Sequence, residues 1–141
     1  MGVHSVSTLG GFRAGQSIVV FGCGPVGLLC MAVAKALGAS RIVAVDIVSS
    51  RLEFARSYAA ADSYLPPKTE QGETKVAYCK RNAERFKAEL GIEDQGKNAI
   101  DLVIDASGAE ESIQAAIHVA KRGGTVVQVE LPDIGPNLIR C

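Results

Sequence analysis

Residues 17–27 read Ser-Ile-Val-Val-Phe-Gly-Cys-Gly-Pro-Val-Gly. The part Ser17–Phe21 is a short, mostly apolar run, which is typical of a strand covered on both faces of a parallel sheet. The glycines of Gly22–Gly27 have the spacing G-x-G-x-x-G, and Pro25 is a favoured residue in the first turn of a helix. The stretch therefore predicts a strand, a tight glycine turn and a helix in direct succession.

The three glycines have separate physical roles in such a turn. Gly22 permits the tight turn, Gly24 lets a pyrophosphate approach the backbone, and Gly27 lets the helix pack closely on the strand. Free N–H groups at the helix N-terminus and the helix dipole then favour a phosphate. A glycine-rich turn without a ligand is the alternative in a chain with 15 glycines, but the position between strand and helix favours binding. The residues expected to hold the phosphates of a dinucleotide are Gly22, Cys23, Gly24, Pro25, Val26 and Gly27.

A carboxylate follows the second predicted strand. Asp46 comes directly after the apolar run Ile42–Val45, about 20 residues beyond the glycine motif, where an acidic residue accepts hydrogen bonds from the ribose hydroxyls of NAD. Its charge would repel the 2′-phosphate of NADP, so NAD is the expected cofactor. We expect Arg51 to lie near the ribose or to pair with Asp46. A helix-capping role for Asp46 is disfavoured because Ser50 and Glu53 form a capping box of their own.

Another polar turn follows the predicted strand Ile100–Ile104. Ser107 and Gly108 belong to the segment Asp105–Gly108, at the carboxyl edge of the sheet, where ligands bind in open α/β folds. An ordinary strand-to-helix turn accounts for these residues equally well. Asp101, near the start of the same strand, is expected to be a surface or cap residue.

The rest of the chain alternates apolar runs with helical segments. Further strands are predicted at Ile42–Val45, Tyr64–Leu65, Ile100–Ile104 and Thr125–Val129. Helices are predicted from Pro25 to Gly38, from Ser50 onward, along the face Val76, Cys79, Ala83, Phe86 and Leu90, and along Ile113, Ala116, Ile117 and Ala120 to Gly123-Gly124. This alternation predicts an α/β fold with a doubly wound, mostly parallel sheet.

Composition limits the class of protein. With 141 residues, 48% of them hydrophobic, the chain has the size of one domain with a sizeable core. Its 15 basic and 15 acidic residues cancel, so neither nucleic acid nor a membrane is an expected partner. The four cysteines form no metal-ligand cluster, and His4 and His118 are expected to be structural. No secretory segment is recognised, and reduced thiols fit a cytoplasmic protein.

Together these features resemble the medium-chain, zinc-containing polyol dehydrogenases. Within that family the chain is most similar to the fungal xylitol dehydrogenases, or D-xylulose reductases. The similarity extends over about residues 2–129 and includes the run His4–Gly11. The segments that carry it are Gly2-Val3-His4, Gly22–Gly27, Asp46, Arg51, Asp105–Gly108 and Gly123–Val129.

The resemblance implies that residues 1–129 are the Rossmann-type, NAD-binding domain of an oxidoreductase that transfers hydride from a polyol to NAD, converting xylitol to D-xylulose. Backbone groups around Val129 would hold the nicotinamide carboxamide. Zinc and the catalytic residues would belong to a separate domain absent from this chain, so the chain alone is expected to be inactive. A stand-alone NAD-binding regulatory module without catalysis stays open as an alternative. S-adenosylmethionine-dependent methyl transfer is disfavoured, because its glycine turn seldom has a third glycine at the spacing of Gly27.

The segment after Val129 departs from the family pattern. Residues 130–141 form a divergent tail, in which Glu130 replaces a glycine that relatives usually have, so the nicotinamide end of the site is expected to differ. The last strand of the sheet is expected to be missing. Thr125–Val129 would then present a bare edge, which templates pairing with another chain, and homo-oligomers are expected.

Overall fold

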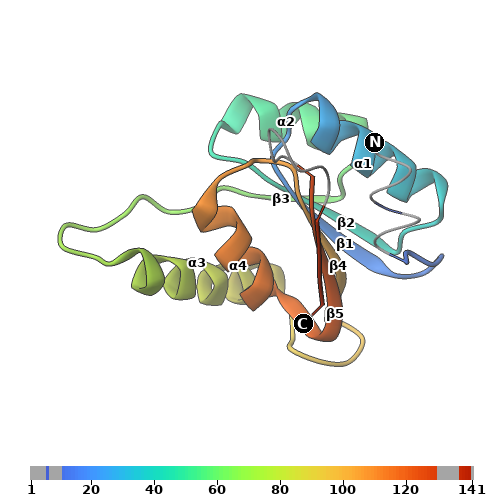
Figure 1. The fold of residues 1–141 in the computed structure, drawn as a ribbon. Helices are drawn as coiled ribbons and strands as arrows, with labels where there is room; N and C mark the ends of the chain where they lie inside the picture. The colour runs from blue at the N-terminus through green and yellow to red at the C-terminus, as the bar shows by residue number, and fades with distance from the viewer. Residues whose placement is uncertain (1–5, 7–10, 130–136, 141) are drawn as a thin grey trace.

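The computed structural model of the chain describes residue 6, residues 11–129 and residues 137–140. They form one sheet with helices on both faces (Figure 1), and its strand order is β3-β2-β1-β4-β5-β6. This is the doubly wound Rossmann-type order, in which the chain reverses direction across the sheet between β1 and β4. The elements are β1 (Ser17–Phe21), α1 (Pro25–Ala36), β2 (Arg41–Val45), α2 (Ser49–Tyr58), β3 (Asp62–Tyr64), α3 (Lys75–Leu90), β4 (Ile100–Asp105), α4 (Glu110–Val119), β5 (Ala120–Gln128) and β6 (Asn137–Arg140).

Alternation along the strands divides the apolar core between the two faces of the sheet. In β1, Ile18 and Val20 belong to the cluster that packs under α1 and α2. Val19 and Phe21 belong to the cluster that packs under α3 and α4. Figure 1 shows the two helix pairs on opposite sides of the sheet. All five residues of β1 are buried, as expected of a strand at the centre of a parallel sheet.

The strand register brings three turns to one edge of the sheet. Phe21 pairs with Val45 of β2 and with Asp105 of β4, and all three strands are parallel. The residues that follow these strand ends therefore emerge side by side. The glycine turn, Asp46 and Ala106 lie next to one another for this reason, although they are far apart in sequence.

The start of α1 agrees with the sequence prediction, and the start of α2 differs from it. Pro25 begins α1, and α3 begins after Thr74, whose hydroxyl accepts a hydrogen bond from the Ala77 N–H. The capping box predicted at Ser50 is wrong, because α2 begins at Ser49 with Val48 at the N-cap and no side-chain cap. The Asp46 carboxylate accepts the Val48 N–H at 2.8 Å instead, so the turn before α2 is held by a residue outside the helix.

The boundary between α4 and β5 lies earlier than predicted. The helix was expected to reach Gly123-Gly124, but β5 already begins at Ala120. Ala120 pairs with Ile100, and the register then shifts so that Thr125 pairs with Leu102. The extra residues of β5 are accommodated at Gly123, whose φ of 74° is the left-handed conformation that glycine adopts without strain. The glycines thus belong to an irregularity in the strand.

The sheet has a sixth strand, so the expectation that it lacks its last strand is wrong. β6 runs antiparallel to β5, and Thr125–Gln128 pair with Asn137–Arg140. The physical reason is the length of the connection. Residues 129–136 are fewer than the dozen or more that a crossover to a parallel strand requires, whereas an antiparallel return needs only a short link. The predicted bare edge along β5 is therefore also wrong, and self-association stays a prediction without that support.

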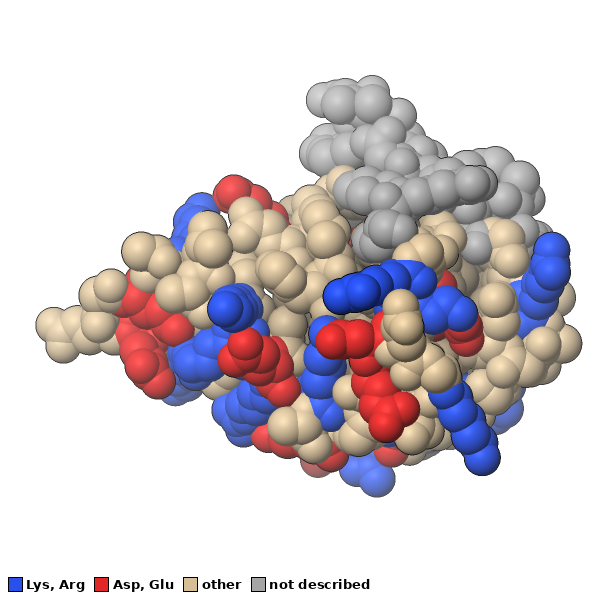
Figure 2. All heavy atoms as spheres, turned by 90° about the horizontal axis from the view of Figure 1, so that it is seen from below, with Lys and Arg blue, Asp and Glu red and all other residues tan. Residues whose placement is uncertain are grey.

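Two apolar side chains that the helical pattern placed inward are exposed. Val76 at the start of α3 is 67% exposed, and Ile117 of α4 is 41% exposed. On the face shown in Figure 2, basic and acidic side chains are interspersed. Ion pairs of this kind surround α3, as between Arg81 and Glu73. None of the helices in the described ranges is long and apolar enough to span a membrane.

Candidate nucleotide site at the carboxyl edge of the sheet

In the turn after β1, the surrounding protein requires glycine at two of the three motif positions, whereas a side chain would fit at the third. Gly22 has φ 95°, and a Cβ there would lie 2.9 Å from the backbone of Ala106 and Ser107. A Cβ at Gly27 would overlap the carbonyl oxygen of Gly22. At Gly24 a Cβ would meet no atom within 4 Å. The protein therefore leaves free space beside the backbone at Gly24, where the sequence predicts that a pyrophosphate approaches.

Asp46 links the glycine turn to the end of β2. Its Oδ2 accepts the Cys23 N–H at 2.8 Å, and its Oδ1 accepts the Val48 N–H at 2.8 Å. The residue is 8% exposed, so the carboxylate is largely buried but reaches the surface of a pocket. Each carboxylate oxygen can accept more than one hydrogen bond. The side chain can therefore hold the turn and still accept hydroxyl groups of a ligand.

The Cys23 thiol is a structural group in this turn. It points to the Val45 carbonyl oxygen at 3.9 Å and is buried. Burial and the neighbouring Asp46 charge raise the pKa of Cys23 to about 12, against the opposing effect of Arg51. The thiol therefore remains protonated near neutral pH and is not a nucleophile.

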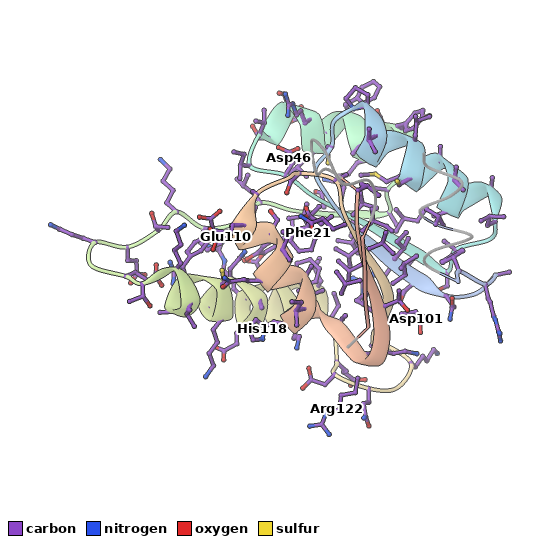
Figure 3. The ribbon with its side chains drawn as sticks, viewed as in Figure 1. Phe21, Asp46, Asp101, Glu110, His118 and Arg122 are labelled. Atoms are coloured by element: carbon purple, nitrogen blue, oxygen red, sulfur yellow. The ribbon has the colours of Figure 1, made fainter. Side chains whose placement is uncertain are left out.

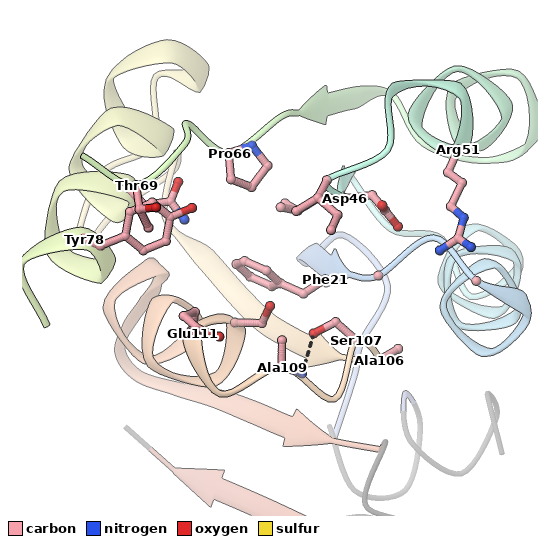
Figure 4. Close-up of a pocket in the computed structure, with 16 residues that line it drawn as sticks. Phe21, Asp46, Arg51, Pro66, Thr69, Tyr78, Ala106, Ser107, Ala109 and Glu111 are labelled. Atoms are coloured by element: carbon pink, nitrogen blue, oxygen red, sulfur yellow. Dashed lines mark hydrogen bonds between the residues drawn. The ribbon is translucent and has the colours of Figure 1, made fainter. Parts of the chain in front are cut away.

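A pocket of about 460 Å³ opens beside these residues (Figure 4). Its volume lies in the range of small-molecule sites. It receives residues from the ends of β1, β2, β3 and β4 and from the three helices α2, α3 and α4. The lining residues are Phe21, Gly22, Gly24, Val45, Asp46, Ile47, Arg51, Pro66, Thr69, Tyr78, Asn82, Ala106, Ser107, Ala109, Glu111 and Ser112.

The turn after β4 is a hydrogen-bonded turn that also borders this pocket. The Asp105 Oδ1 accepts the Ser107 N–H at 3.1 Å and the Ser107 hydroxyl at 2.7 Å. The Ser107 Oγ in turn accepts the Ala109 N–H at 3.2 Å, shown dashed in Figure 4. Gly108 has φ 71°. Ser107 therefore shapes the turn and lines the pocket, and its contact with a ligand stays a prediction.

Some of the predicted site residues line the pocket, and others do not. Val129 is buried and donates its N–H to the Asp105 carbonyl oxygen at 2.9 Å. The predicted residues that line the pocket are Gly22, Gly24, Asp46, Arg51 and Ser107. Those outside its lining are Cys23, Pro25, Val26, Gly27, Gly108 and Val129. Glu130 and His4 lie outside the described residues.

The far end of the pocket contains residues that the sequence did not reveal. Asn82 and Tyr78 come from α3, and the Tyr64 hydroxyl of β3 donates a hydrogen bond to Asn82. Asn82 is 6% exposed. A signal was present, because Asn82 lies three residues after Cys79 and four before Phe86, on the buried face of the helix. An amide on an apolar face needs a partner, which makes it a candidate site residue.

The opposite edge of the sheet is held together by side-chain hydrogen bonds and an ion pair. Asp101 was expected at the surface or in a cap, but its carboxylate accepts the Ser17 N–H at 2.9 Å and the Ser17 hydroxyl, and it pairs with Lys121. Figure 3 shows Asp101 far from Asp46 and Phe21, with His118 on α4. His118 is exposed. In the described part of the chain, no three His, Cys, Asp or Glu residues are grouped to hold a metal ion.

The fold and the turn geometry define a Rossmann-type domain whose carboxyl edge carries a nucleotide-sized pocket. The sequence profile of the family described as zinc-binding dehydrogenase matches residues 25–138. The chain therefore belongs to the zinc-binding dehydrogenase family.

Relatives and solved structures agree with this family. The chain is 51% identical over 126 residues to a probable D-xylulose reductase A of Aspergillus niger, and 55% identical over 114 residues to that of Aspergillus terreus. These matches cover 89% and 81% of this chain but 32% and 29% of the relatives. An alcohol dehydrogenase from Thermus sp. ATN1 superposes with a TM-score of 0.70 at 29% identity, over 94% of this chain and 34% of that one. For 2R,3R-butanediol dehydrogenase from Bacillus subtilis the TM-score is 0.71 at 25% identity, over 95% and 33%. The chain thus spans about a third of the proteins it matches.

Proposed function

We propose that this chain is the NAD-binding domain of a polyol dehydrogenase that interconverts xylitol and D-xylulose. The observation that carries the proposal is the position of the Asp46 carboxylate. This carboxylate borders the pocket at the end of β2 and is hydrogen-bonded to the glycine turn. Further support comes from D-xylulose reductases, with which the chain shares 51% and 55% sequence identity.

The residues of the turn fit a dinucleotide. The free space at Gly24 and the N-terminus of α1 accept the pyrophosphate, because unpaired N–H groups and the helix dipole favour its negative charge. Asp46 accepts the adenosine ribose hydroxyls and repels a 2′-phosphate, so the domain selects NAD over NADP. When bound, NAD supplies the acceptor of the hydride. The chain's own contribution is to bind and orient that acceptor.

The oxidation of a polyol needs residues beyond those described. Relatives carry a family name that refers to zinc, and the described residues do not fit a zinc site. We therefore propose that the metal and the substrate are held by another domain. The purified chain with NAD and xylitol should form no NADH. Steady NADH formation, with contaminating enzyme excluded by a second purification, would contradict this two-domain assignment.

Calorimetric titration with NAD and NADP tests the cofactor assignment. A charge-assisted hydrogen bond is worth about 1.5–3 kcal/mol, so Asp46→Ala should weaken NAD binding by about 10- to 150-fold. NADP should lose less or gain, because the substitution removes repulsion of the 2′-phosphate. Asp94→Ala is a matched control, since Asp94 is exposed and pairs with Lys87 away from the pocket. An unchanged ratio of NAD to NADP affinity in Asp46→Ala would refute the ribose role.

A further inference from the structure

Asn82 presents a single buried amide at the end of the pocket opposite the glycine turn. Asp46 and the glycine turn occupy one end, and Figure 4 shows Tyr78 and Thr69 at the other. Asn82 lies one helical turn after Tyr78, on the same face of α3. A nucleotide with its phosphates at the turn and its ribose at Asp46 must extend its base toward this end. This inference therefore rests on the proposed function.

A hydrogen bond from Tyr64 fixes the orientation of the Asn82 amide. The Tyr64 hydroxyl donates to the Asn82 Oδ1 at 2.8 Å, and Tyr64 is 2% exposed with its ring edge-on to Phe86 at 5.1 Å between centroids. Burial raises the pKa of Tyr64 to about 12, so the hydroxyl keeps the proton that it donates in this hydrogen bond. Because Oδ1 accepts the Tyr64 hydroxyl, the amide nitrogen Nδ2 is the atom of the side chain that can donate to a ligand. No hydrogen bond between described residues uses this Nδ2 atom.

The neighbouring polar groups are already engaged or exposed. The Tyr78 hydroxyl donates to the Pro67 carbonyl oxygen at 2.8 Å, and Arg81 lies over the Tyr78 ring at 5.6 Å. Tyr78 therefore offers the pocket an aromatic wall. Thr69 is exposed, where water competes for its hydroxyl. Asn82 is 6% exposed as a residue, and a ligand that covers its Nδ2 must compensate the water contact that this donor loses.

We propose that Asn82 is a base-reading residue, whose Nδ2 donates a hydrogen bond to a ring nitrogen of adenine, and that Tyr64 is the positioning residue that holds this donor. Adenine has acceptor nitrogens at N1, N3 and N7, and each is a suitable partner. The two residues would make the domain selective for the purine base, in addition to the selection of the ribose by Asp46.

Calorimetric titration of the chain with ADP and with its 1-deaza, 3-deaza and 7-deaza analogues tests the proposal. Each analogue replaces one ring nitrogen by C–H and changes little else. One analogue should bind more weakly than ADP by about 5- to 100-fold, because it leaves a buried donor without a partner. Equal affinity for all four nucleotides would overturn the proposal while leaving the proposed function intact. If ADP itself does not bind, both are overturned.

Substitutions separate recognition from general damage to the pocket. Asn82→Leu, with a side chain of similar size, should weaken ADP binding and remove the difference between ADP and the sensitive analogue. Asn82→Asp, which has the same shape without the donor, gives the same test if the leucine variant does not fold. Tyr64→Phe keeps the ring packing and should narrow the difference by freeing the amide to rotate. A difference that persists in these folded variants would overturn the assignment, as would sensitivity to dimethylation of the adenine N6 group alone.

Discussion

An aspartate lies at each end of the central strands, and the two differ in what their carboxylates contact. Asp46 at the carboxyl end and Asp101 at the amino end both accept backbone N–H groups from another segment. Asp101 is also paired with Lys121 and bonded to the Ser17 hydroxyl. Asp46 makes no ion pair with a described residue and borders the pocket. The same residue type therefore ties strands together at one edge and borders the pocket at the other.

The difference follows from the direction of the parallel strands. At their carboxyl ends the chain turns into helices whose N-termini present free N–H groups, and these attract anions. At their amino ends the preceding helices present carbonyl groups, and a cation such as Lys121 is suited to that edge. A carboxylate at the amino edge is neutralised by this cation, whereas one at the carboxyl edge remains available.

The largest expected effect separates two glycines of the same turn. Gly27→Ala places a Cβ against the Gly22 carbonyl oxygen, so it should destabilise the fold by about 3 kcal/mol or more. Gly24→Ala has open space and φ −78°, and should change the free energy of unfolding by less than about 1 kcal/mol. It should nevertheless weaken NAD binding, because its methyl group occupies the phosphate approach. Chemical denaturation and calorimetry check both variants. Equal stability losses would contradict the distinction between packing and binding glycines.

A smaller effect is expected from pH at the amino edge. Burial alone would raise the pKa of Asp101, but the Lys121 ammonium and the Ser17 groups outweigh it, so the pKa lies below its ordinary value. A carboxyl group with a depressed folded pKa contributes stability above its unfolded pKa of about 3.9 and loses it as the pH falls further.

Asp101→Asn should therefore be less stable than the parent by about 1 kcal/mol at pH 7, because it removes charge-assisted hydrogen bonds. Its free energy of unfolding should fall less steeply below pH 4. Urea denaturation between pH 2 and 7 measures both slopes. Parallel pH profiles for parent and variant would show that Asp101 does not have this role.

The smallest effect concerns thiol reactivity in the glycine turn. Cys23 has a raised pKa and is buried, so iodoacetamide at pH 8 should leave it unmodified in the folded chain. Asp46→Ala removes the hydrogen bond to the Cys23 N–H and should speed its alkylation several-fold by loosening the turn. Cys30, on the buried face of α1, is the internal control. Peptide mass spectrometry gives both rates, and equal acceleration at Cys30 would indicate general unfolding instead.

The sequence predicted the central strands and the glycine turn because both depend on local patterns. Ser17–Phe21 and the turn after it were located correctly, since an apolar run followed by spaced glycines has few other structures. The role of Asn82 could not be predicted in the same way, because its partner Tyr64 comes from another element. The start of β5 at Ala120 and the pairing of β6 likewise depend on contacts with another strand, which the local pattern of one segment does not specify.

We propose that a dinucleotide binds at the carboxyl edge and that the amino edge is structural. Titration of the ¹⁵N-labelled chain with NAD, followed by amide NMR signals, tests it most directly, since 14.7 kDa is a suitable size. We predict large shifts at Cys23, Gly24 and Ser107, and unchanged signals at Ser17 and Asp101. Shifts concentrated at the amino edge, or no shifts at millimolar NAD, would contradict binding at the carboxyl edge.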